Sequence, residues 1–378
     1  MATSPIPFIN LGRTVEKIRN KVLKEWETVL DGLEFVAPPR VAKLEGEISE
    51  SIGVKNVFCC ANGTDAITLA LQSAGIGRGH KVGVPNLTFW ASYEAIVSVG
   101  ATPVLIDVDR ADLQVSFQEL QSAHSTYKLN ALVFPHLYGF ASLHLASIRS
   151  FCRSNDIKVI EDGAQCYGVR INGESILGDA EIGTLSFYPA KVIGGCMDGG
   201  AVVGSSADMV ALARKLGNHG RSNHYSYSHV GWNSRMGGLQ AAFISEMLTI
   251  EKDIIGSRVS ALQLYKELYE STPAIHDKVE MRMPADGVSG NGYLSVFLMR
   301  DRDADPIKEQ LQAKGIGCGR TYPETISQQS CCIDDLKASE LTVSRDICRQ
   351  VLNLPLFAFI TAEECERSFE AFVEVLSK

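Results

Sequence analysis

One lysine, Lys191, stands where the surrounding residues favour covalent chemistry. An apolar, strand-like run ending in Pro189 precedes it, and four glycines follow it closely (Gly194, Gly195, Gly199 and Gly200). A lysine in a desolvated pocket loses its proton more readily, and the free amine attacks carbonyl carbons. The alternative is a solvated lysine in a glycine-rich loop, which is the commoner situation for this residue type. Other motifs must decide between the two.

The stretch Ala61-Asn-Gly-Thr-Asp-Ala66 suits an anion. Small residues here precede an apolar helical run, so the backbone N–H groups at the start of the helix would face the ligand, and the helix dipole would add to the attraction. The alternative is a plain helix N-terminus capped by Thr64 or Asp65.

A carboxylate and an amide follow a third apolar run. Asp162 ends the predicted strand at residues 158–161, and Gln165 comes three residues later. If a helical turn begins there, both side chains face one ligand. A buried aspartate needs a cationic partner, and a protonated pyridine nitrogen would serve. The alternative is an aspartate that caps the next helix.

Composition excludes some classes of function. The chain has 378 residues, 45% of them hydrophobic and 21% charged, which is ordinary for a globular protein. Its formal net charge is −8 and no cluster of Lys and Arg occurs, so we expect no nucleic-acid partner. No run approaches the ~20 apolar residues of a membrane span. The N-terminus lacks a signal-peptide pattern. We therefore expect a cytoplasmic protein without a membrane partner.

Cysteines and histidines do not indicate a metal. Ten cysteines include the adjacent pairs at 59–60 and 331–332, which are poor disulfide partners, so we expect reduced thiols. Residues 219–230 are polar and aromatic, contain three histidines and predict an exposed loop. The histidine spacing matches no usual ligand pattern, so we expect no metal site.

Apolar runs that suit strands alternate with helical patterns along most of the chain, which predicts a mainly parallel sheet covered on both faces. The predicted strands span residues 56–60, 81–84, 102–107, 131–134, 158–161, 183–187 and 200–204. The predicted helices span residues 13–30, 40–51, 65–74, 90–99, 145–155, 206–217 and 237–270. A second, smaller unit is predicted from a strand at 293–299 and helices at 305–313, 345–352 and 362–376. Sites in parallel sheets lie at the carboxyl ends of the strands, so one pocket could collect Asn62, Asp162 and Lys191.

Taken in order, these motifs resemble the DegT/DnrJ/EryC1/StrS family of pyridoxal-phosphate-dependent sugar aminotransferases, which have the aspartate aminotransferase fold (fold type I). The resemblance covers nearly the whole chain. Its motifs are Ile6-Pro-Phe-Ile-Asn10, Asn62-Gly-Thr-Asp-Ala66, Pro85-Asn-Leu-Thr-Phe89, Pro135-His-Leu-Tyr-Gly139, Glu161-Asp-Gly-Ala-Gln165, Ser186-Phe-Tyr-Pro-Ala-Lys191, Asp198-Gly-Gly-Ala201, Asn218-His-Gly-Arg221 and Gly231-Trp-Asn-Ser-Arg-Met236. It implies a large α/β domain over 1–250 with a mainly parallel seven-stranded sheet flanked by helices, and a smaller C-terminal α/β domain over 251–378.

The resemblance also implies roles for single residues. Lys191 is similar to the lysine that forms the internal Schiff base with pyridoxal 5′-phosphate and moves the proton. Asp162 resembles the carboxylate on the pyridine nitrogen, Gln165 the partner of the ring hydroxyl, and Phe89 the aromatic that stacks on the ring. The phosphate ligands are implied to be Gly63, Thr64 and Ser186. The residues implied to reach in from a second subunit are Asn233 and Arg235.

The implied reaction is ping-pong transfer of an amino group from L-glutamate to a keto sugar, in the first instance a nucleotide-linked sugar with a C3 or C4 ketone. Such a step belongs to amino-sugar biosynthesis for polysaccharides or antibiotics. A homodimer with shared active sites is implied as well. We consider four side chains for contacts with phosphate or sugar, namely Tyr188, His219, Arg221 and Arg320. For each of them, a structural role is the alternative.

Other readings remain. Much of the chain is also compatible with three alternatives. The protein could be a relative that dehydrates or aminodehydrates its substrate, or a regulatory protein that binds a ligand on the same fold. An aminotransferase could also act on a ketone that is not linked to a nucleotide. A nicotinamide-binding fold is disfavoured, because Gly75, Gly77 and Gly79 lack the GxGxxG spacing. Departures from the family pattern fall at Gly163, at residues 192–196 and at 237–238. The last two are expected near the substrate.

Overall fold

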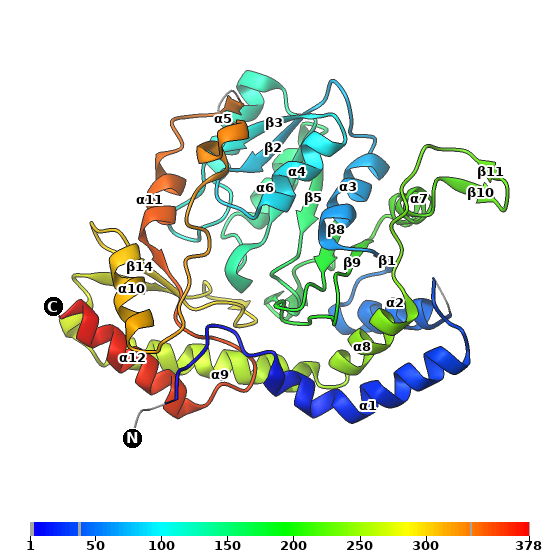
Figure 1. Ribbon diagram of the computed structural model, residues 1–378. Coiled ribbons are helices and arrows are strands. Elements are labelled where there is room, and N and C mark those ends of the chain that lie inside the picture. The colour runs from blue at the N-terminus through cyan, green and yellow to red at the C-terminus, as the bar shows by residue number, and fades with distance from the viewer. Residues whose placement is uncertain (1–3, 37–38, 333–334, 378) are drawn as a thin grey trace.

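The computed structural model describes residues 4–36, 39–332 and 335–377. Its largest element is an eight-stranded sheet with the strand order β1-β9-β8-β5-β4-β2-β3-β15 (Figure 1). Strand β9 is antiparallel to both of its neighbours, and the remaining pairs are parallel. The strands are β1 (Asn56–Cys60), β2 (Lys81–Pro85), β3 (Thr102–Ile106), β4 (Ala131–Pro135), β5 (Lys158–Asp162), β8 (Ile182–Ser186), β9 (Gly200–Gly204) and β15 (Leu336–Lys337). The seven strands predicted from the sequence are all present, and the two-residue β15 adds an eighth at the edge.

Helices cover both faces of this sheet, because its strands are apolar on both sides. In β1, Val57 and Cys59 pack into one core and Phe58 and Cys60 into the other, as the alternation of side chains along a strand requires. One face is covered by α3 (Gly63–Ser73), α4 (Trp90–Ser98) and α7 (Ala207–Gly217). The other is covered by α1 (Gly12–Asp31), α2 (Pro39–Ile52), α5 (Phe117–Tyr127), α6 (Leu145–Ser154) and α8 (Gly238–Leu248).

A second, smaller unit has its own sheet and core. The strands β12 (Val279–Arg282), β14 (Val296–Met299) and β16 (Val351–Leu352) form an antiparallel sheet. It packs with α9 (Glu251–Glu270), α10 (Asp305–Ala313) and α12 (Ala362–Leu376). The N-terminal Ile6 belongs to this core and pairs with Ile316. The division of the chain at residues 250 and 251 stays a prediction.

Three segments differ from the sequence-based expectation. The helix predicted over 237–270 is two helices, α8 and α9, which separate at Thr249 and Ile250. The helix predicted over 345–352 is α11 (Thr342–Gln350), whose last expected residues form β16 instead. Helix α5 was not expected, since only two of its side chains are buried, although Ser116 caps its start by accepting a hydrogen bond from the amide of Glu119.

The remaining elements are short. Residues 219–230 include the hairpin strands β10 (Arg221–Asn223) and β11 (Ser226–Tyr227), which project from the body of the molecule (Figure 1). The exposure predicted for this segment is confirmed by Tyr225 and Val230, which are 84% and 96% exposed. The other short strands are β6 (Arg170–Ile171), β7 (Glu174–Ser175) and β13 (Val288–Ser289), and the 3-10 turns are η1 (Leu137–Gly139), η2 (Pro273–Ile275), η3 (Ile326–Gln328) and η4 (Ser330–Cys332).

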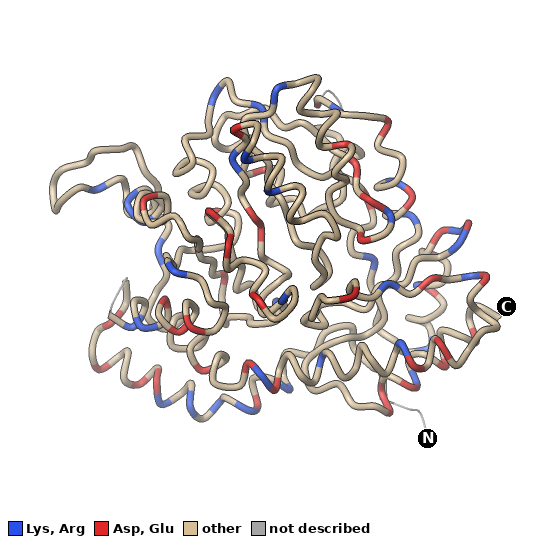
Figure 2. The backbone as a smooth tube through the Cα atoms, turned by 180° about the vertical axis from the view of Figure 1, so that it is seen from behind, with Lys and Arg blue, Asp and Glu red and all other residues tan. Residues whose placement is uncertain are grey.

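Charges of both signs are interspersed over the chain, and they are mixed along the outer helix α1 (Figure 2). In the described residues, none of the helices is both long and apolar enough to cross a bilayer. The same residues hold no group of three or more His, Cys, Asp or Glu side chains that could share a metal ion. All ten cysteines are free thiols.

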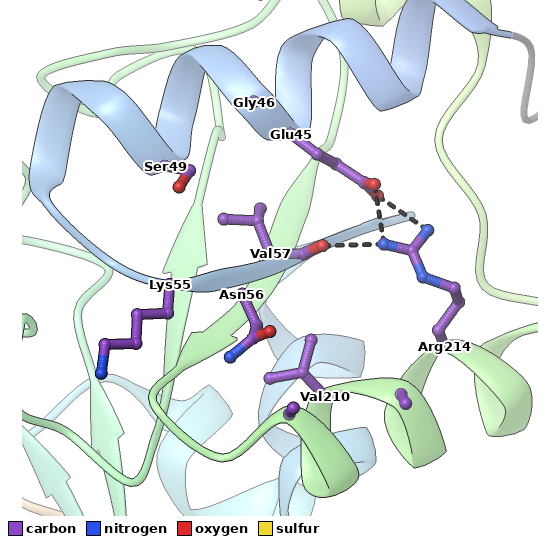
Figure 3. Close-up of a pocket in the computed structure, with 10 residues that line it drawn as sticks. Glu45, Gly46, Ser49, Lys55, Asn56, Val57, Val210 and Arg214 are labelled. Atoms are coloured by element: carbon purple, nitrogen blue, oxygen red, sulfur yellow. Dashed lines mark hydrogen bonds and ion pairs between the residues drawn. The ribbon is translucent and has the colours of Figure 1, made fainter.

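An ion pair ties α7 to α2 and β1. From α7, Arg214 donates to both carboxylate oxygens of Glu45 on α2, at 2.7 and 3.1 Å, and to the carbonyl of Val57 on β1 at 2.8 Å (Figure 3). Glu45 also accepts the amide of Cys59 at 2.8 Å. These side chains line a surface groove of about 350 Å³. Because Glu45 and Arg214 are paired with each other and with the backbone of β1, we assign these two side chains to the stability of the fold.

Replacing Glu45 by alanine should destabilise the protein. The buried amide of Cys59 would lose its acceptor, which costs about 1–3 kcal/mol of unfolding free energy. The exposed side of the ion pair adds little. Urea denaturation measures the change, and Lys55→Ala in the same groove is the control, with an expected change within about 0.5 kcal/mol. Equal effects of the two substitutions would contradict this role of Glu45.

Candidate active site

The carboxyl ends of the parallel strands meet at one edge of the large sheet, as expected for this class of fold. A cavity of about 770 Å³ lies there. The segments that follow β1, β2, β4, β5 and β8 all contribute to its wall. Of the thirteen residues considered from the sequence for contacts with cofactor or substrate, eight line it, namely Gly63, Thr64, Phe89, Asp162, Gln165, Ser186, Tyr188 and Lys191.

Asp162 is a buried carboxylate at the end of β5. Its Oδ2 accepts the hydroxyl of Ser92 on α4 at 2.9 Å, and its Oδ1 accepts the amide of Ala164 at 3.1 Å. Ser92 is itself fixed by Thr88, 3.0 Å away. No cation pairs with Asp162 within the described residues. Hydrogen bonds from neutral donors fix its orientation. The carboxylate is therefore already positioned to pair with a cationic group of a ligand in the cavity.

Gln165 lies on the turn after β5 with both ends of its amide engaged. Its Oε1 accepts the amide of Tyr138 at 2.6 Å, and its Nε2 donates to the hydroxyl of Tyr322 at 2.6 Å. The ring of Tyr322 stands 6.1 Å from that of Phe89. Phe89 is 53% exposed at the start of α4, so one face of its ring is free for a planar ligand.

The start of α3 forms a close-packed cradle against the end of β8. Asn62 caps the helix, since its Oδ1 accepts the amide of Asp65 at 2.8 Å. The cap is therefore Asn62 rather than Thr64 or Asp65, and the helix begins two residues earlier than Asp65. A Cβ at Gly63 would lie 2.9 Å from Cβ of Ser186, so only glycine lets the helix start approach this serine. The first amides of a helix have no partner within it, which suits them to an anion.

Lys191 is half-buried on the turn after β8, on the wall of the cavity. Its amide donates to the carbonyl of Tyr188 at 2.9 Å, which closes the turn. Its Nζ lies 3.4 Å from the hydroxyl of Tyr293 and 5.3 Å from the centre of that ring. A Cβ at Gly194 would lie 2.3 Å from the carbonyl oxygen of Pro189, so the turn requires a glycine there.

Five singled-out side chains lie outside the cavity. His219, Arg221, Asn233 and Arg235 belong to the projecting segment and its base, where Arg235 donates to Asn233 Oδ1 at 2.8 Å. Arg320 is an ion-pair partner of Asp305 in the smaller unit. Of the four side chains considered for substrate contacts, only Tyr188 therefore lines the cavity in a single chain.

The structure adds residues that sequence reasoning missed. Tyr293 and Tyr322 reach the cavity from the smaller unit, and Ser92 approaches Asp162 from 70 positions away in the sequence. No local pattern marks these side chains, because their roles depend on contacts between distant segments. His136 does lie in a quoted motif, and a buried chain of contacts anchors it.

The chain of contacts at His136 begins at Glu161. Glu161 Oε2 lies 3.0 Å from His136 Nε2 and 2.7 Å from Arg149 Nη2. Burial alone would raise the pKa of Glu161, but the hydrogen bonds from His136 and Arg149 outweigh it and lower that pKa. The other ring nitrogen of His136 is buried without a partner in the described structure. This network fixes the wall of the cavity between β4 and β5.

Two stretches that depart from the family pattern, residues 192–196 and 237–238, were expected near the substrate, and their surroundings differ. Gly237 and Gly238 line neither this cavity nor its neighbour at Lys191. A Cβ at Gly238 would lie 1.9 Å from the carbonyl oxygen of Glu34, so close packing against the loop before α2 explains this glycine. Residues Val192, Gly194, Gly195 and Cys196, in contrast, line a second cavity that also borders Lys191.

The residues present fit pyridoxal phosphate. The cavity combines a lysine amine, a buried carboxylate without a cationic partner among the described residues, an exposed aromatic face and a helix start that a Cβ would obstruct. Each matches one part of the cofactor: its aldehyde, its ring nitrogen, its ring face and its phosphate.

Comparisons with known proteins agree with this fit. The model of the DegT/DnrJ/EryC1/StrS aminotransferase family matches residues 16–373. The UDP-N-acetyl-3-dehydro-alpha-D-glucosamine 3-aminotransferase of Acidithiobacillus ferrooxidans is 30% identical over 96% of this chain and 95% of its own. A pleiotropic regulatory protein of Geobacillus stearothermophilus is 27% identical over 98% of both chains. The structure of DesV from S. venezuelae in complex with a ketimine intermediate superimposes with a TM-score of 0.93 and 27% identity, covering 100% of each chain.

The chain belongs to the DegT/DnrJ/EryC1/StrS aminotransferase family. It is an aminotransferase of the pyridoxal-phosphate-dependent type, and its fold is that of the family.

Replacing Gly63 by alanine should weaken cofactor binding. The new Cβ would push the start of α3 away from Ser186, and loss of one charge-assisted hydrogen bond to phosphate corresponds to about a tenfold weaker affinity or more. Titration of the apoprotein with pyridoxal phosphate, followed by absorbance, measures this affinity.

Gly46→Ala is the matched control for that titration, because a Cβ at this helical position meets nothing within 4 Å. It should leave the affinity for the cofactor unchanged. A folded Gly63→Ala protein with wild-type affinity would show that the cradle is not the phosphate site.

Proposed function

We propose that this protein transfers an amino group from L-glutamate to the keto group of a nucleotide-linked sugar. The observation that carries the proposal is the placement of Lys191 and Asp162 on the wall of one cavity, together with the cradle at Gly63 and Ser186. An amine, a carboxylate and an anion site around one cavity are the groups that this chemistry requires.

Lys191 is the catalytic residue of the proposal. Its amine would hold the cofactor, and the same amine would move a proton to and from the reacting carbon. When bound, pyridoxal phosphate supplies a carbonyl that takes up the amino group and a ring that accepts electrons. Tyr293, 3.4 Å from Nζ, positions the amine on the cavity side.

Asp162 and its partners supply the electrostatic support. The carboxylate keeps a ring nitrogen protonated, and Ser92 fixes its orientation through the hydrogen bond of 2.9 Å. Gln165 is held at both ends and presents its amide to the ring hydroxyl. Phe89 covers one face of the ring, and the start of α3 with Ser186 binds the phosphate. The two substrates then react in turn beside the same amine, that of Lys191, which is the ping-pong scheme.

The sugar is proposed from relatives. The enzyme of A. ferrooxidans is named for a UDP-linked 3-keto sugar, and the similarity spans almost the whole of both chains. This supports a nucleotide-linked ketone as the substrate and favours C3 over C4. The G. stearothermophilus relative is named as a regulatory protein, so a regulatory role is the alternative function. Lys191 and Asp162 argue against that role, because binding without turnover needs no free amine opposite a buried carboxylate.

We also propose a homodimer with shared sites. Asn233 is exposed and lies outside the cavity of its own chain. It stands at the base of the projecting segment, which exposes Tyr225 at its tip and Val230 after β11. Such a segment gains stability by packing on a second copy. Asn233 and Arg235 would then reach the cavity of the partner.

A half-reaction tests the enzyme assignment. Purified protein should be yellow, borohydride should fix the cofactor to the peptide that holds Lys191, and L-glutamate alone should give 2-oxoglutarate and pyridoxamine phosphate. Lys191→Ala should lose the covalent attachment, and its half-reaction should slow by about 10²–10⁴-fold, because the proton-transfer group is gone. Mass spectrometry and absorbance report the two effects.

Lys252→Ala, an exposed lysine on α9, is the control and should behave as the wild type. The absence of any spectral change with every amino donor tried would favour the regulatory alternative. Normal turnover by Lys191→Ala would refute the role of the lysine.

Mixing two inactive chains tests the shared site. In a dimer of Asn233→Ala with Lys191→Ala, one of the two sites would combine an intact lysine with an intact asparagine. We expect activity to return when the chains are refolded together, up to the fraction of such intact sites. Each chain refolded alone is the control. Heterodimers that form without regaining activity would rule out the cross-subunit role of Asn233.

A further inference from the structure

A second cavity, of about 450 Å³, also borders Lys191. Its wall is mostly apolar and joins the N-terminal segment, α1, α8 and the segment after β16 to the turn that follows Lys191. The apolar side chains in the wall include Leu11, Trp26, Val192, Phe243, Met247 and Phe357. Lys191 lines both cavities, and its Nζ lies 3.4 Å from the hydroxyl of Tyr293 on the wall of the first one.

Besides Lys191, the apolar wall of this cavity holds a second basic side chain, Arg258. Arg258 lies on α9 and is 5% exposed. Its Nη1 donates to two backbone carbonyls, of Leu356 at 3.2 Å and Gly292 at 3.4 Å, while its Nε is buried without a partner. Burial lowers the pKa of Arg258 to about 10, so the guanidinium still carries its charge at neutral pH.

The charge of Arg258 lacks the compensation that other arginines have. Arg149, Arg214 and Arg320 each pair with a carboxylate. Within the part of the chain that the structure describes, no carboxylate lies within ion-pair distance of Arg258. A buried cation without a counter-ion is costly, and fixed backbone dipoles offset only part of that cost. The site therefore suits an anionic ligand.

We propose that Arg258 binds a carboxylate of the amino-acid donor in this second cavity, beside Lys191. The inference rests on the proposed aminotransferase function and assigns the place of its first substrate. Arginine is the residue type best suited to a buried carboxylate, because its planar fork matches the two oxygens. The apolar wall would contact the methylene groups of L-glutamate.

The charges of the larger cavity support this division. Three acidic side chains line it, Asp65, Glu94 and Asp198, in addition to Asp162. They disfavour a donor with two carboxylates beside them, whereas the sugar ring of the acceptor is uncharged and only its nucleotide part must lie away from them. Lys191 can serve both substrates, since it lies where the two cavities meet.

Direct binding of an unreactive dicarboxylate tests the site. Calorimetric titration of the holoenzyme with succinate should show binding to the wild type and about a tenfold or greater loss of affinity in Arg258→Met, which removes a charge-assisted pair. Arg282→Met is the matched control, because this arginine is also partly buried in the smaller unit but lines neither cavity. It should bind succinate as the wild type does.

The two half-reactions give a second readout. In Arg258→Met, the half-saturating concentration of L-glutamate should rise about tenfold or more. The half-reaction of the pyridoxamine form with a keto sugar should stay within about twofold of the wild type, since that substrate does not use the arginine. If Arg258→Met does not fold, Arg258→Lys, which keeps the charge but loses the fork, replaces it in both measurements.

The outcomes distinguish a failure of the Arg258 site from a failure of the proposed aminotransferase function. Loss of the glutamate and the sugar half-reactions to the same extent, or unchanged succinate binding by a folded variant, would show that Arg258 is structural and overturn the inference. If L-alanine weakens together with L-glutamate, the arginine binds the α-carboxylate, and if only L-glutamate weakens, it binds the distal one. Either result supports the site. A wild-type protein that accepts no amino donor refutes the proposed function, and the succinate titration still tests Arg258.

Discussion

The parallel direction of the strands in the large sheet is the constraint on which the site depends. Parallel strands all end at the same edge, so the segments after them face one space even when they are far apart in the sequence. Asn62, Asp162 and Lys191 come together in this way. The single antiparallel strand, β9, returns the chain after the Lys191 turn and pairs with both β1 and β8. This holds the cradle of Gly63 against Ser186.

The smaller unit completes the site rather than merely covering it. Tyr293 contacts Lys191, Tyr322 contacts Gln165, and Arg258 adds a cation to the mostly apolar wall of the second cavity. A separate apolar cluster joins β14 and α11 to the segments after β2, β3 and β4. Packing between the two units therefore sets the distances at the reactive lysine. Lys191 lies at the boundary of two cavities with different electrostatic character, which gives the proposed donor and acceptor different places.

Much of the fold was predictable because its signals are local. The seven main strands are short apolar runs, and their alternation with amphipathic helices indicates a parallel sheet without any knowledge of pairing. The break between α8 and α9 was not predictable, since residues 237–270 have a helical pattern throughout. Helix α5 was missed for the opposite reason, because a surface helix that buries only two side chains has a weak periodic signal.

For the site, the sequence determined the residue types and their places at strand ends: the lysine on a glycine-rich turn, the aspartate after an apolar strand, and the small residues before α3. These follow from short-range patterns and from their order along the chain. The tertiary structure alone decided which groups meet. Ser92 fixes Asp162, Tyr293 contacts Lys191, and Arg258 lines a cavity at Lys191 without a carboxylate partner among the described residues. Such contacts join segments far apart in sequence or depend on close packing, so no local pattern contains them. The sequence thus identified the reactive amine, and the packing of two units around it determined what it can reach.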